Sequence, residues 1–308
     1  MERLECSRIA KRYGRGAYAL RDISLSIPAS GIFALIGRNG AGKTTLVRIL
    51  ATQLSATSGS AHIDGIDVLR QAQKLRERIA SVPQEARAVG WLTARQSMVS
   101  YLLWRGFGYS EAVEKASRAA KQLGIVGSMD LPNRMLSGGN KRKVLVASAV
   151  ASGARILFLD EPTTGLDPIS RKELWDILMS LKGKHFIFLT THYLEEAEYL
   201  ADKIGILDGG RLKAIGTMAE LRKMVKRHYI IRTLSDGAVA RPVSGTLTRG
   251  ADGHYQISTT ESEAYRISKK LIKRGIKFSM NPLTLDDIFY YIVKKPIDAD
   301  DYGKEESR

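Results

Sequence analysis

The chain has 308 residues, 44% of them hydrophobic, and a formal net charge of +16 at pH 7. That length suits one large domain with a smaller one, and the apolar fraction is ordinary for a protein with a packed core. The single cysteine, Cys6, excludes an intrachain disulfide, which is typical of a reducing compartment. The first residues lack the apolar stretch of a secretory signal, and no apolar run reaches the roughly 18 residues of a membrane helix. We therefore expect a soluble protein of the cytoplasm.

The positive charge permits two interpretations. It could serve an anionic partner, such as nucleic acid or an acidic membrane surface, or it could be spread over a solvated surface. The second is favoured because no long unbroken run of lysine and arginine occurs. The last residues, 298–308, are polar and charged, and we expect a disordered end there.

Near the N-terminus, apolar and polar residues alternate over residues 20–27 and 59–68, as they do in strands with one buried face. The second segment contains Asp64 and Gly65, a dipeptide typical of hairpin turns. Together these segments predict an antiparallel β flap.

Short continuous apolar runs that predict buried strands follow along the chain. They are residues 31–37, 79–83, 155–160, 185–191 and 203–208. Helical patterns between them cover residues 44–54 and 168–182; the second has Pro168 in its first turn and Gly183 as its stop. Strands that alternate with helices predict an α/β core with a parallel sheet.

Residues 86–152 are helix-like and predict a helical subdomain inserted in that core. One of its helices is predicted to begin at Ser110 as N-cap and to end at Gly124.

The pattern changes again near residue 222, so we predict one domain over residues 1–222 and an accessory domain over residues 223–308. Residues 228–235 and 254–259 look like strands. An amphipathic helix follows with a Thr260/Glu263 capping box, and a second helix starts with a Thr284/Asp287 box. The second helix carries Phe289, Tyr290 and Tyr291, which we expect to be an exposed apolar run. The whole predicts a small α+β tail.

Residues 37–45, GRNGAGKTT, predict a phosphate-binding loop. Gly37 and Gly42 let backbone N–H groups wrap phosphates, Lys43 reaches the β and γ oxygens, and the Thr44 hydroxyl can bind Mg²⁺. The preceding strand and the following helix are the context that such a loop needs.

Two carboxylates end the strand at residues 155–160. Asp160 can hold the Mg²⁺ shell, and Glu161 can polarise an attacking water. The alternative is that both merely cap the strand. His192 also follows an apolar strand, where open α/β sheets place ligands, although a lone histidine is usually structural. No set of histidine and cysteine has metal-site spacing, so Mg²⁺ with a nucleotide is the metal implied.

Residues 136–143, LSGGNKRK, are harder to interpret. Ser137 is expected near the start of a helix, where exposed backbone N–H groups would bind an anion. Lys141, Arg142 and Lys143 would then lie in the first turn, where the helix dipole disfavours cations. Either something anionic or functional compensates them, or the segment is a plain glycine-rich loop with a solvated basic turn.

The order of these motifs along the chain resembles the ATPase subunit of an ABC transporter over about residues 1–222. The motifs are residues 37–45, Gln84, residues 136–139, residues 158–162, residues 165–168 and His192. The resemblance identifies them as the Walker A loop, the Q-loop, the signature, Walker B, the D-loop and the switch histidine.

The resemblance implies ATP and Mg²⁺ as cofactors and a role for each matched residue. The catalytic residues would be Glu161, His192 and Gln84, and the metal would be held by Thr44, Gln84 and Asp160. The other nucleotide contacts would be Tyr13, Gly37, Asn39, Gly40, Gly42, Lys43, Thr44, Thr45, Ser137, Gly138, Gly139 and Asp167. Tyr13 matches the aromatic residue that stacks on adenine; alternatively it packs in a strand, or Tyr18 takes the role. Gln84 would report the γ-phosphate, and Asp167 would lie at a dimer interface.

The signature has Asn140 where glutamine is usual, followed by Lys-Arg-Lys, and the tail contains TLDDIF. Both resemble the branch of drug-resistance and lipid exporters that pairs with type-2 permeases. The Asn140 departure puts the usual contact of that residue in doubt.

In this family two ATPase chains bind head to tail, so that the signature of one completes the phosphate site of the other. The resemblance therefore implies a second copy or a close relative as partner, a separate membrane permease, and a location at the inner face of the cell membrane. Nucleic acid is an unlikely partner under this interpretation. The alternatives are a soluble ABC ATPase that acts on ribosomes or nucleic acid and a catalytically dead scaffold, which the presence of Lys43, Asp160, Glu161 and His192 disfavours.

Overall fold

A computed structural model describes residues 3–225, 229–234, 245–249 and 255–294. It divides into two compact units, Met1–Lys213 and Ala214–Arg308. The predicted disordered end, residues 298–308, lies outside the described residues. Within the described ranges, no helix combines the length and the apolar character needed to cross a membrane.

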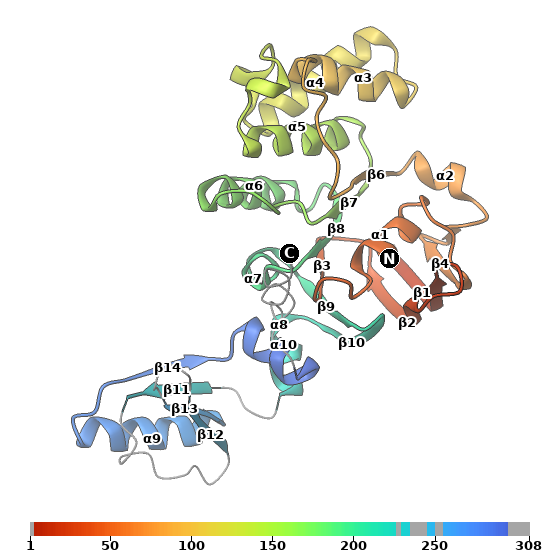
Figure 1. Cartoon of the computed structure of the whole chain (residues 1–308). Coiled ribbons are helices and arrows are strands. Elements are labelled where there is room, and N and C mark those ends of the chain that lie inside the picture. The colour runs from red at the N-terminus through yellow and green to blue at the C-terminus, as the bar shows by residue number, and fades with distance from the viewer. Residues whose placement is uncertain (1–2, 226–228, 235–244, 250–254, 295–308) are drawn as a thin grey trace, which may run out of the picture. The chain divides into compact units, whose positions relative to one another are not determined.

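The first unit is built on a six-stranded sheet with the order β10-β9-β3-β8-β7-β6 (Figure 1). Its strands are β3 (Ile32–Ile36), β6 (Ile79–Val82), β7 (Ile156–Asp160), β8 (Phe186–Thr191), β9 (Lys203–Asp208) and β10 (Arg211–Gly216). β3 pairs in parallel with β8 and β9, and β7 pairs in parallel with β6 and β8. Every residue of β3, β7 and β8 is buried, as expected for apolar strands covered on both faces. The predicted α/β class with a parallel sheet is confirmed.

Three helices accompany this sheet: α1 (Lys43–Leu50), α6 (Pro168–Leu181) and α7 (Leu194–Leu200). α1 is shorter than the predicted helix over residues 44–54, because the chain turns at Ala51 and takes a left-handed backbone at Thr52. α6 has the predicted ends: Asp167 is its N-cap, Pro168 its first residue, and Gly183 follows its last turn.

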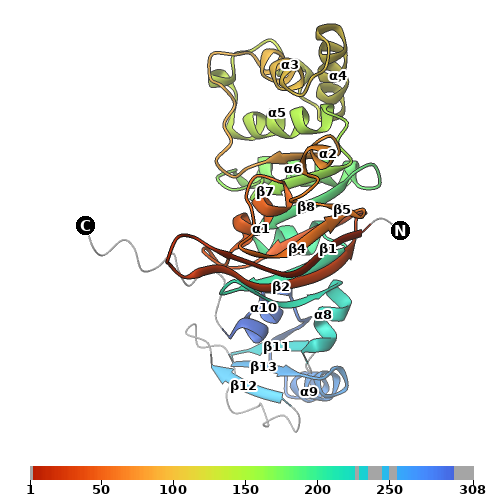
Figure 2. The same cartoon turned by 90° about the vertical axis from the view of Figure 1, so that its right-hand side faces the viewer.

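An antiparallel sheet lies beside this core, with the order β2-β1-β4-β5 (Figure 2). Its strands are β1 (Arg3–Arg12), β2 (Tyr18–Pro28), β4 (Ser58–Ile63) and β5 (Ile66–Asp67). Asp64 and Gly65 make the turn between β4 and β5. The predicted antiparallel flap is confirmed.

The helical subdomain follows a short helix, α2 (Ala72–Arg76), and β6. Its helices are α3 (Ala94–Trp104), α4 (Tyr109–Gln122), η1 (Val126–Ser128), η2 (Asn133–Met135) and α5 (Gly138–Ala151), and α3, α4 and α5 pack together (Figure 1). The predicted N-cap Ser110 is wrong. The N-cap of α4 is Gly108, which has an extended backbone and whose carbonyl accepts the N–H of Ala112, so Ser110 lies inside the first turn.

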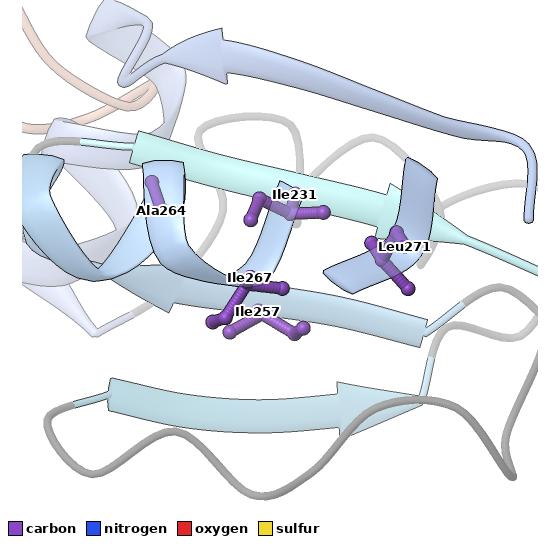
Figure 3. Close-up of a cluster of buried hydrophobic side chains, with 5 residues drawn as sticks. All are labelled: Ile231, Ile257, Ala264, Ile267 and Leu271. Carbon is purple, nitrogen blue, oxygen red and sulfur yellow. The ribbon is translucent and has the colours of Figure 1, made fainter. Parts of the chain in front are cut away.

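The second unit contains a four-stranded antiparallel sheet with the order β12-β13-β11-β14. Its elements are α8 (Met218–Met224), β11 (Tyr229–Thr233), β12 (Gly245–Arg249), β13 (Tyr255–Thr259), α9 (Glu261–Lys273), β14 (Phe278–Pro282) and α10 (Leu285–Val293). Figure 3 shows that α9 directs its apolar face at the sheet, where Ile231 and Ile257 meet Ala264, Ile267 and Leu271. The predicted α+β tail is confirmed as a fold class.

The two predicted capping boxes differ in outcome. Thr284 and Asp287 exchange both expected hydrogen bonds at the start of α10. Thr260 is the N-cap of α9 but makes no capping bond with its side chain, and Glu263 forms an ion pair with Arg266. The predicted box at Thr260 is therefore wrong, because it needs a bond accepted by the Thr260 side chain and that bond does not form.

The predicted exposed run on α10 is wrong in part. Tyr290 and Tyr291 are exposed, but Phe289 is fully buried, because it lies on the inner face of an amphipathic helix with Leu285 and Ile288.

Truncation of Leu271 tests the core of the second unit. Leu271 is 0% exposed in the cluster of Figure 3, so Leu271→Ala should lower the free energy of unfolding of this unit by about 2–5 kcal/mol. The matched control is its neighbour Ile272, which is 65% exposed and should cost about 0.5 kcal/mol or less on the same change.

Urea unfolding followed by two probes separates the units. The three tryptophans, at positions 91, 104 and 175, all lie in the first unit, so their fluorescence reports that unit alone. Circular dichroism should gain an earlier transition in Leu271→Ala while the fluorescence midpoint stays unchanged. Equal effects of Leu271→Ala and Ile272→Ala would contradict the assigned core.

Candidate functional site

The predicted phosphate loop connects β3 to α1, and its glycines are required by shape. A Cβ on Gly37 would lie 2.3 Å from the carbonyl oxygen of Leu207. Gly42 has φ of 106°, and a Cβ there would lie 2.5 Å from the carbonyl oxygen of Ala19. Asn39 and Gly40 form the exposed tip of the loop. The loop opens directly into the first turn of α1, where free N–H groups suit a phosphate.

Lys43 lies across this loop. Its ammonium donates to the carbonyls of Gly37, at 2.8 Å, and Arg38, at 3.2 Å, and it is 3.3 Å from Oε1 of Glu161. Burial lowers the pKa of Lys43, and the charges of Glu161 and Asp160 counteract that shift. A buried cation is thus balanced by a buried carboxylate in the same site.

Asp160 ends β7 and is buried. Its carboxylate accepts hydrogen bonds from Thr190 of β8 and from Thr44 of α1, although burial raises its pKa. Among the described residues no group of three His, Cys, Asp or Glu side chains could hold a metal. Oxygen donors of the kind that Mg²⁺ prefers occur here on the Thr44 hydroxyl, the Asp160 carboxylate and the Gln84 amide, and these could hold the ion.

Glu161 is the centre of the site. Its Oε2 lies 3.0 Å from Nδ1 of His192, 3.1 Å from Nε2 of Gln84 and 3.0 Å from Oγ1 of Thr164. Burial would raise the pKa of Glu161, but the His192 bond, the Lys43 charge and the Thr164 bond together lower it to about 2. Glu161 is therefore ionised at neutral pH, with Lys43 on one oxygen and three polar groups on the other.

The backbone of Glu161 is unusual for a residue with a side chain, since its φ is 46°. Thr190 holds it in this conformation: the N–H of Glu161 donates to Oγ1 of Thr190, at 3.0 Å, and to its carbonyl, at 3.1 Å. The turn directs the carboxylate toward the phosphate loop and Lys43.

Tyr13 follows the end of β1 and is half exposed. Its hydroxyl lies 3.4 Å from Oγ1 of Thr45 in α1, which puts its ring beside the phosphate loop. Tyr18 starts β2 and has the guanidinium of Arg12 over its ring.

The signature segment begins α5. Ser137 is the N-cap, and its Oγ accepts the N–H of Asn140 at 3.2 Å. Gly139 leaves no room for a side chain, because a Cβ would lie 2.6 Å from Oγ of Ser170 in α6. Asn140, which replaces the usual glutamine, has its amide nitrogen 3.4 Å from Oγ of Ser128.

Asp167 is the N-cap of α6 and accepts the N–H groups of Ile169 and Ser170, and its bonds to Ser170 lower its pKa. Ser137, Gly138 and Asp167 are all exposed. The structure does not bring this group to the phosphate loop: among the described residues, no hydrogen bond or ion pair joins Ser137 to it, and α5 lies with α3 and α4 away from α1 (Figures 1 and 2).

Of the two alternatives for the basic turn of α5, the structure favours compensation over a solvated turn for two of the three cations. Arg142 is buried and donates to four backbone carbonyls, while Lys143 is buried and forms a 2.8 Å ion pair with Glu173 of α6. Burial and the charge of Arg87 lower the pKa of Arg142 to about 10, so it stays protonated at neutral pH. A helical-face argument could have found this burial, since Arg142 precedes the fully buried Val146 by one turn.

Other residues that contact the site were missed by sequence reasoning. Thr190 and Thr164 hold Glu161 through hydroxyl groups, and only their positions at the end of β8 and after β7 could have indicated this.

Acid unfolding tests the environment of Glu161. The pKa of Glu161 is about 2 in the folded state and roughly 4.3 in the unfolded state. The ionised carboxylate therefore stabilises the folded state fully at pH values above roughly 4.3, and this stabilisation is lost as the pH falls toward 2. Between pH 6 and pH 4 the first unit should lose on the order of 1 kcal/mol more stability in the wild type than in Glu161→Gln, which cannot titrate there. Urea unfolding followed by tryptophan fluorescence measures both slopes, and equal losses in the two proteins would contradict the ion-paired carboxylate.

Comparison with known proteins bears on this geometry. Residues 20–164 match the family model described as ABC transporter. The daunorubicin/doxorubicin resistance ATP-binding protein DrrA of Streptomyces peucetius is 31% identical, over 99% of this chain and 96% of its own. The daunorubicin resistance ATP-binding protein DrrA2 of Streptomyces coeruleorubidus is 34% identical over 91% of each.

Solved structures agree with the sequence comparison. A structure described as the ATP binding subunit of an ABC transporter superposes with a TM-score of 0.63 at 26% identity, over 72% of this chain and 92% of that one. The match in sequence extends over nearly the full length of both resistance proteins, and the loop, the strand-end carboxylates and the histidine occupy one site. The chain is an ATPase and belongs to the ATP-binding subunits of ABC transporters.

Proposed function

We propose that this chain binds Mg·ATP, dimerises head to tail around two nucleotides, and powers export through a separate membrane permease. The observation that carries the proposal is the ionised Glu161 carboxylate, held beside the phosphate loop by Lys43, Gln84 and His192, while the exposed Ser137 turn lies elsewhere on the same chain. In the proposed dimer, the Ser137 turn of a second chain completes the nucleotide site around Glu161 and the phosphate loop.

Nucleotide binding would use the groups around the loop. The N–H groups of residues 37–42 and of the first turn of α1 suit the phosphates, and the half-exposed Tyr13 ring suits the adenine face. Thr44, Gln84 and Asp160 would hold Mg²⁺, which supplies neutralisation of phosphate charge when bound.

Lys43 would exchange partners during this step. A bound phosphate offers its ammonium a charged partner in place of the loop carbonyls and the carboxylate that it now contacts. Departure of that cation raises the pKa of Glu161, which then accepts a proton from the attacking water more readily. His192 and Gln84 would keep the carboxylate oriented throughout, so that catalysis rests chiefly on positioned charges.

The exposed end of α5 supports the proposed head-to-tail dimer. This helix has 14 residues, and Ser137 and Gly138 leave its N-terminus open to an anion. In the proposed dimer that anion is the γ-phosphate bound by the second chain, and Asp167 lies at the same interface.

Coupling to a permease would use a hollow of about 320 Å³ between β6 and the helical subdomain. Its apolar lining includes Val82, Pro83, Ala86, Val89, Leu92, Tyr101, Val144 and Leu145. Pro83 and Ala86 lie on either side of Gln84 in the chain. A permease segment bound in this hollow would therefore move when the Gln84 amide changes its partners. The drug-resistance names of the two Streptomyces relatives support export as the direction of transport. With a membrane permease as partner, the chain would work at the inner face of the membrane.

Replacement of the base should separate binding from hydrolysis. Glu161→Gln removes the proton acceptor but leaves the loop, so ATP affinity should persist while hydrolysis falls about 10²- to 10⁴-fold. The variant should then accumulate as an ATP-bound dimer. Phosphate release and gel filtration in saturating Mg·ATP measure the two effects.

A neighbouring carboxylate provides the matched control. Glu195 lies in the first turn of α7 and is exposed, so Glu195→Gln should hydrolyse ATP at the wild-type rate. A monomeric Glu161→Gln protein with near wild-type activity would contradict the assignment of the base.

Mixing two defective chains tests whether the signature acts in trans. Lys43→Ala removes the cation of the phosphate loop, and Ser137→Arg blocks the signature turn with bulk. Each homodimer should be inactive, because both of its sites are defective. In the heterodimer one site combines both defects and the other is intact, so ATP-dependent closure and some hydrolysis should return.

Cross-linking between the chains should be measured beside hydrolysis, because the two sites can cooperate. If Ser137 served the ATP of its own chain, no site in the heterodimer would be intact. Absence of both signals, once heterodimers are shown to form, would count against the head-to-tail arrangement.

A further inference from the structure

The guanidinium of Arg142 makes an unusual set of contacts for a residue of the signature helix. It is 8% exposed, and its Nε donates to the carbonyl of Pro162 at 2.8 Å. Its Nη2 donates to the carbonyls of Asp160, at 3.0 Å, and Glu161, at 3.1 Å. Its Nη1 donates to the carbonyl of Pro83 at 3.2 Å. All four acceptors belong to the backbone, and a forked side chain is needed to reach them together.

Three of these carbonyls surround the strained turn at Glu161. The N–H of Glu161 is already fixed by Thr190 of β8, and Arg142 fixes the carbonyl side of the same turn. A left-handed backbone at a residue with a side chain persists only where its surroundings hold it. Thr190 and Arg142 therefore hold the backbone of Glu161 from its N–H side and its carbonyl side.

The fourth carbonyl, that of Pro83, connects Arg142 to the Q-loop as well. Pro83 immediately precedes Gln84, whose amide lies 3.1 Å from Oε2 of Glu161. One guanidinium thus fixes the backbone on both sides of the Gln84–Glu161 contact.

We propose that Arg142 is a positioning residue that couples the signature turn of α5 to the base Glu161 and to Gln84 of the same chain. The inference rests on the proposed head-to-tail function, in which Ser137 contacts the nucleotide of the second chain. Arg142 lies about one turn beyond Ser137 on the same helix, so a shift of α5 on the partner's nucleotide moves the guanidinium that holds the carbonyls on either side of and at Glu161. Arg142 thereby links engagement at one ATP site to the geometry of the base at the other.

The test removes the guanidinium of Arg142 while keeping most of the volume of the side chain. Arg142→Met should lower kcat about 10- to 100-fold, as expected for a displaced catalytic group, and leave the Kd for ATP within about threefold. Arg142→Lys keeps the charge but has a single donor centre, so its kcat should lie between those of Arg142→Met and the wild type. The control is Arg118→Met, the same change at an exposed position on α4, which should leave kcat unchanged.

A double variant separates positioning from folding. Arg142→Met in the Glu161→Gln background should cause no further loss of hydrolysis, because the group that Arg142 positions is already absent. That double variant should still accumulate as the ATP-bound dimer, because Ser137 and the phosphate loop are intact. Loss of ATP binding or of this dimer would show that Arg142 only supports the fold of α5, and would overturn the inference.

The outcomes also distinguish this inference from the proposed function. If Glu161→Gln hydrolyses ATP normally, the base assignment fails whatever Arg142 does. If Glu161→Gln is inactive while Arg142→Met or Arg142→Lys has the wild-type kcat, only the role of Arg142 fails.

Discussion

The structure of the first unit depends on one buried carboxylate. Glu161 is 6% exposed and ionised, and burial of a charge is costly unless other groups compensate it. The compensation comes from separate parts of the chain: Lys43 from the phosphate loop, Gln84 from the loop after β6, and His192 from the end of β8. The fold that brings these segments together is the parallel sheet, because its strands end at one common edge.

The Lys43–Glu161 pair also explains how such a site can respond to a ligand. Both charges are buried and lie 3.3 Å apart, so a phosphate that attracts Lys43 necessarily changes the environment of Glu161. A buried pair of this kind contributes little to net stability but ties two states of the site together. In the proposed cycle the carboxylate is therefore a poor base before nucleotide binds and a better one afterwards.

Much of this could be predicted from the sequence, because the informative patterns are local. The phosphate loop, the apolar strands and the Thr284/Asp287 capping box are each set by residues within a few positions of one another. The open alternatives and failures involve contacts made by tertiary structure or an expected local bond that does not form. Whether Arg142 and Lys143 are solvated or compensated is decided only when α5 packs against the Walker B turn and α6, and the side chain of Thr260 does not make its expected capping bond. The bonds that hold Glu161 to Gln84 and His192 join distant positions, and no local pattern predicts their geometry.

An experimental structure of Glu161→Gln bound to Mg·ATP tests the head-to-tail dimer and its shared sites most directly. We expect two chains, with each nucleotide enclosed between the phosphate loop of one and the Ser137 turn of the other. Lys43 should contact the phosphates, and the Arg142 guanidinium should still hold the carbonyls beside residue 161. A single chain closed around its nucleotide, or a Ser137 turn that faces the phosphate loop of its own chain, would contradict the head-to-tail arrangement.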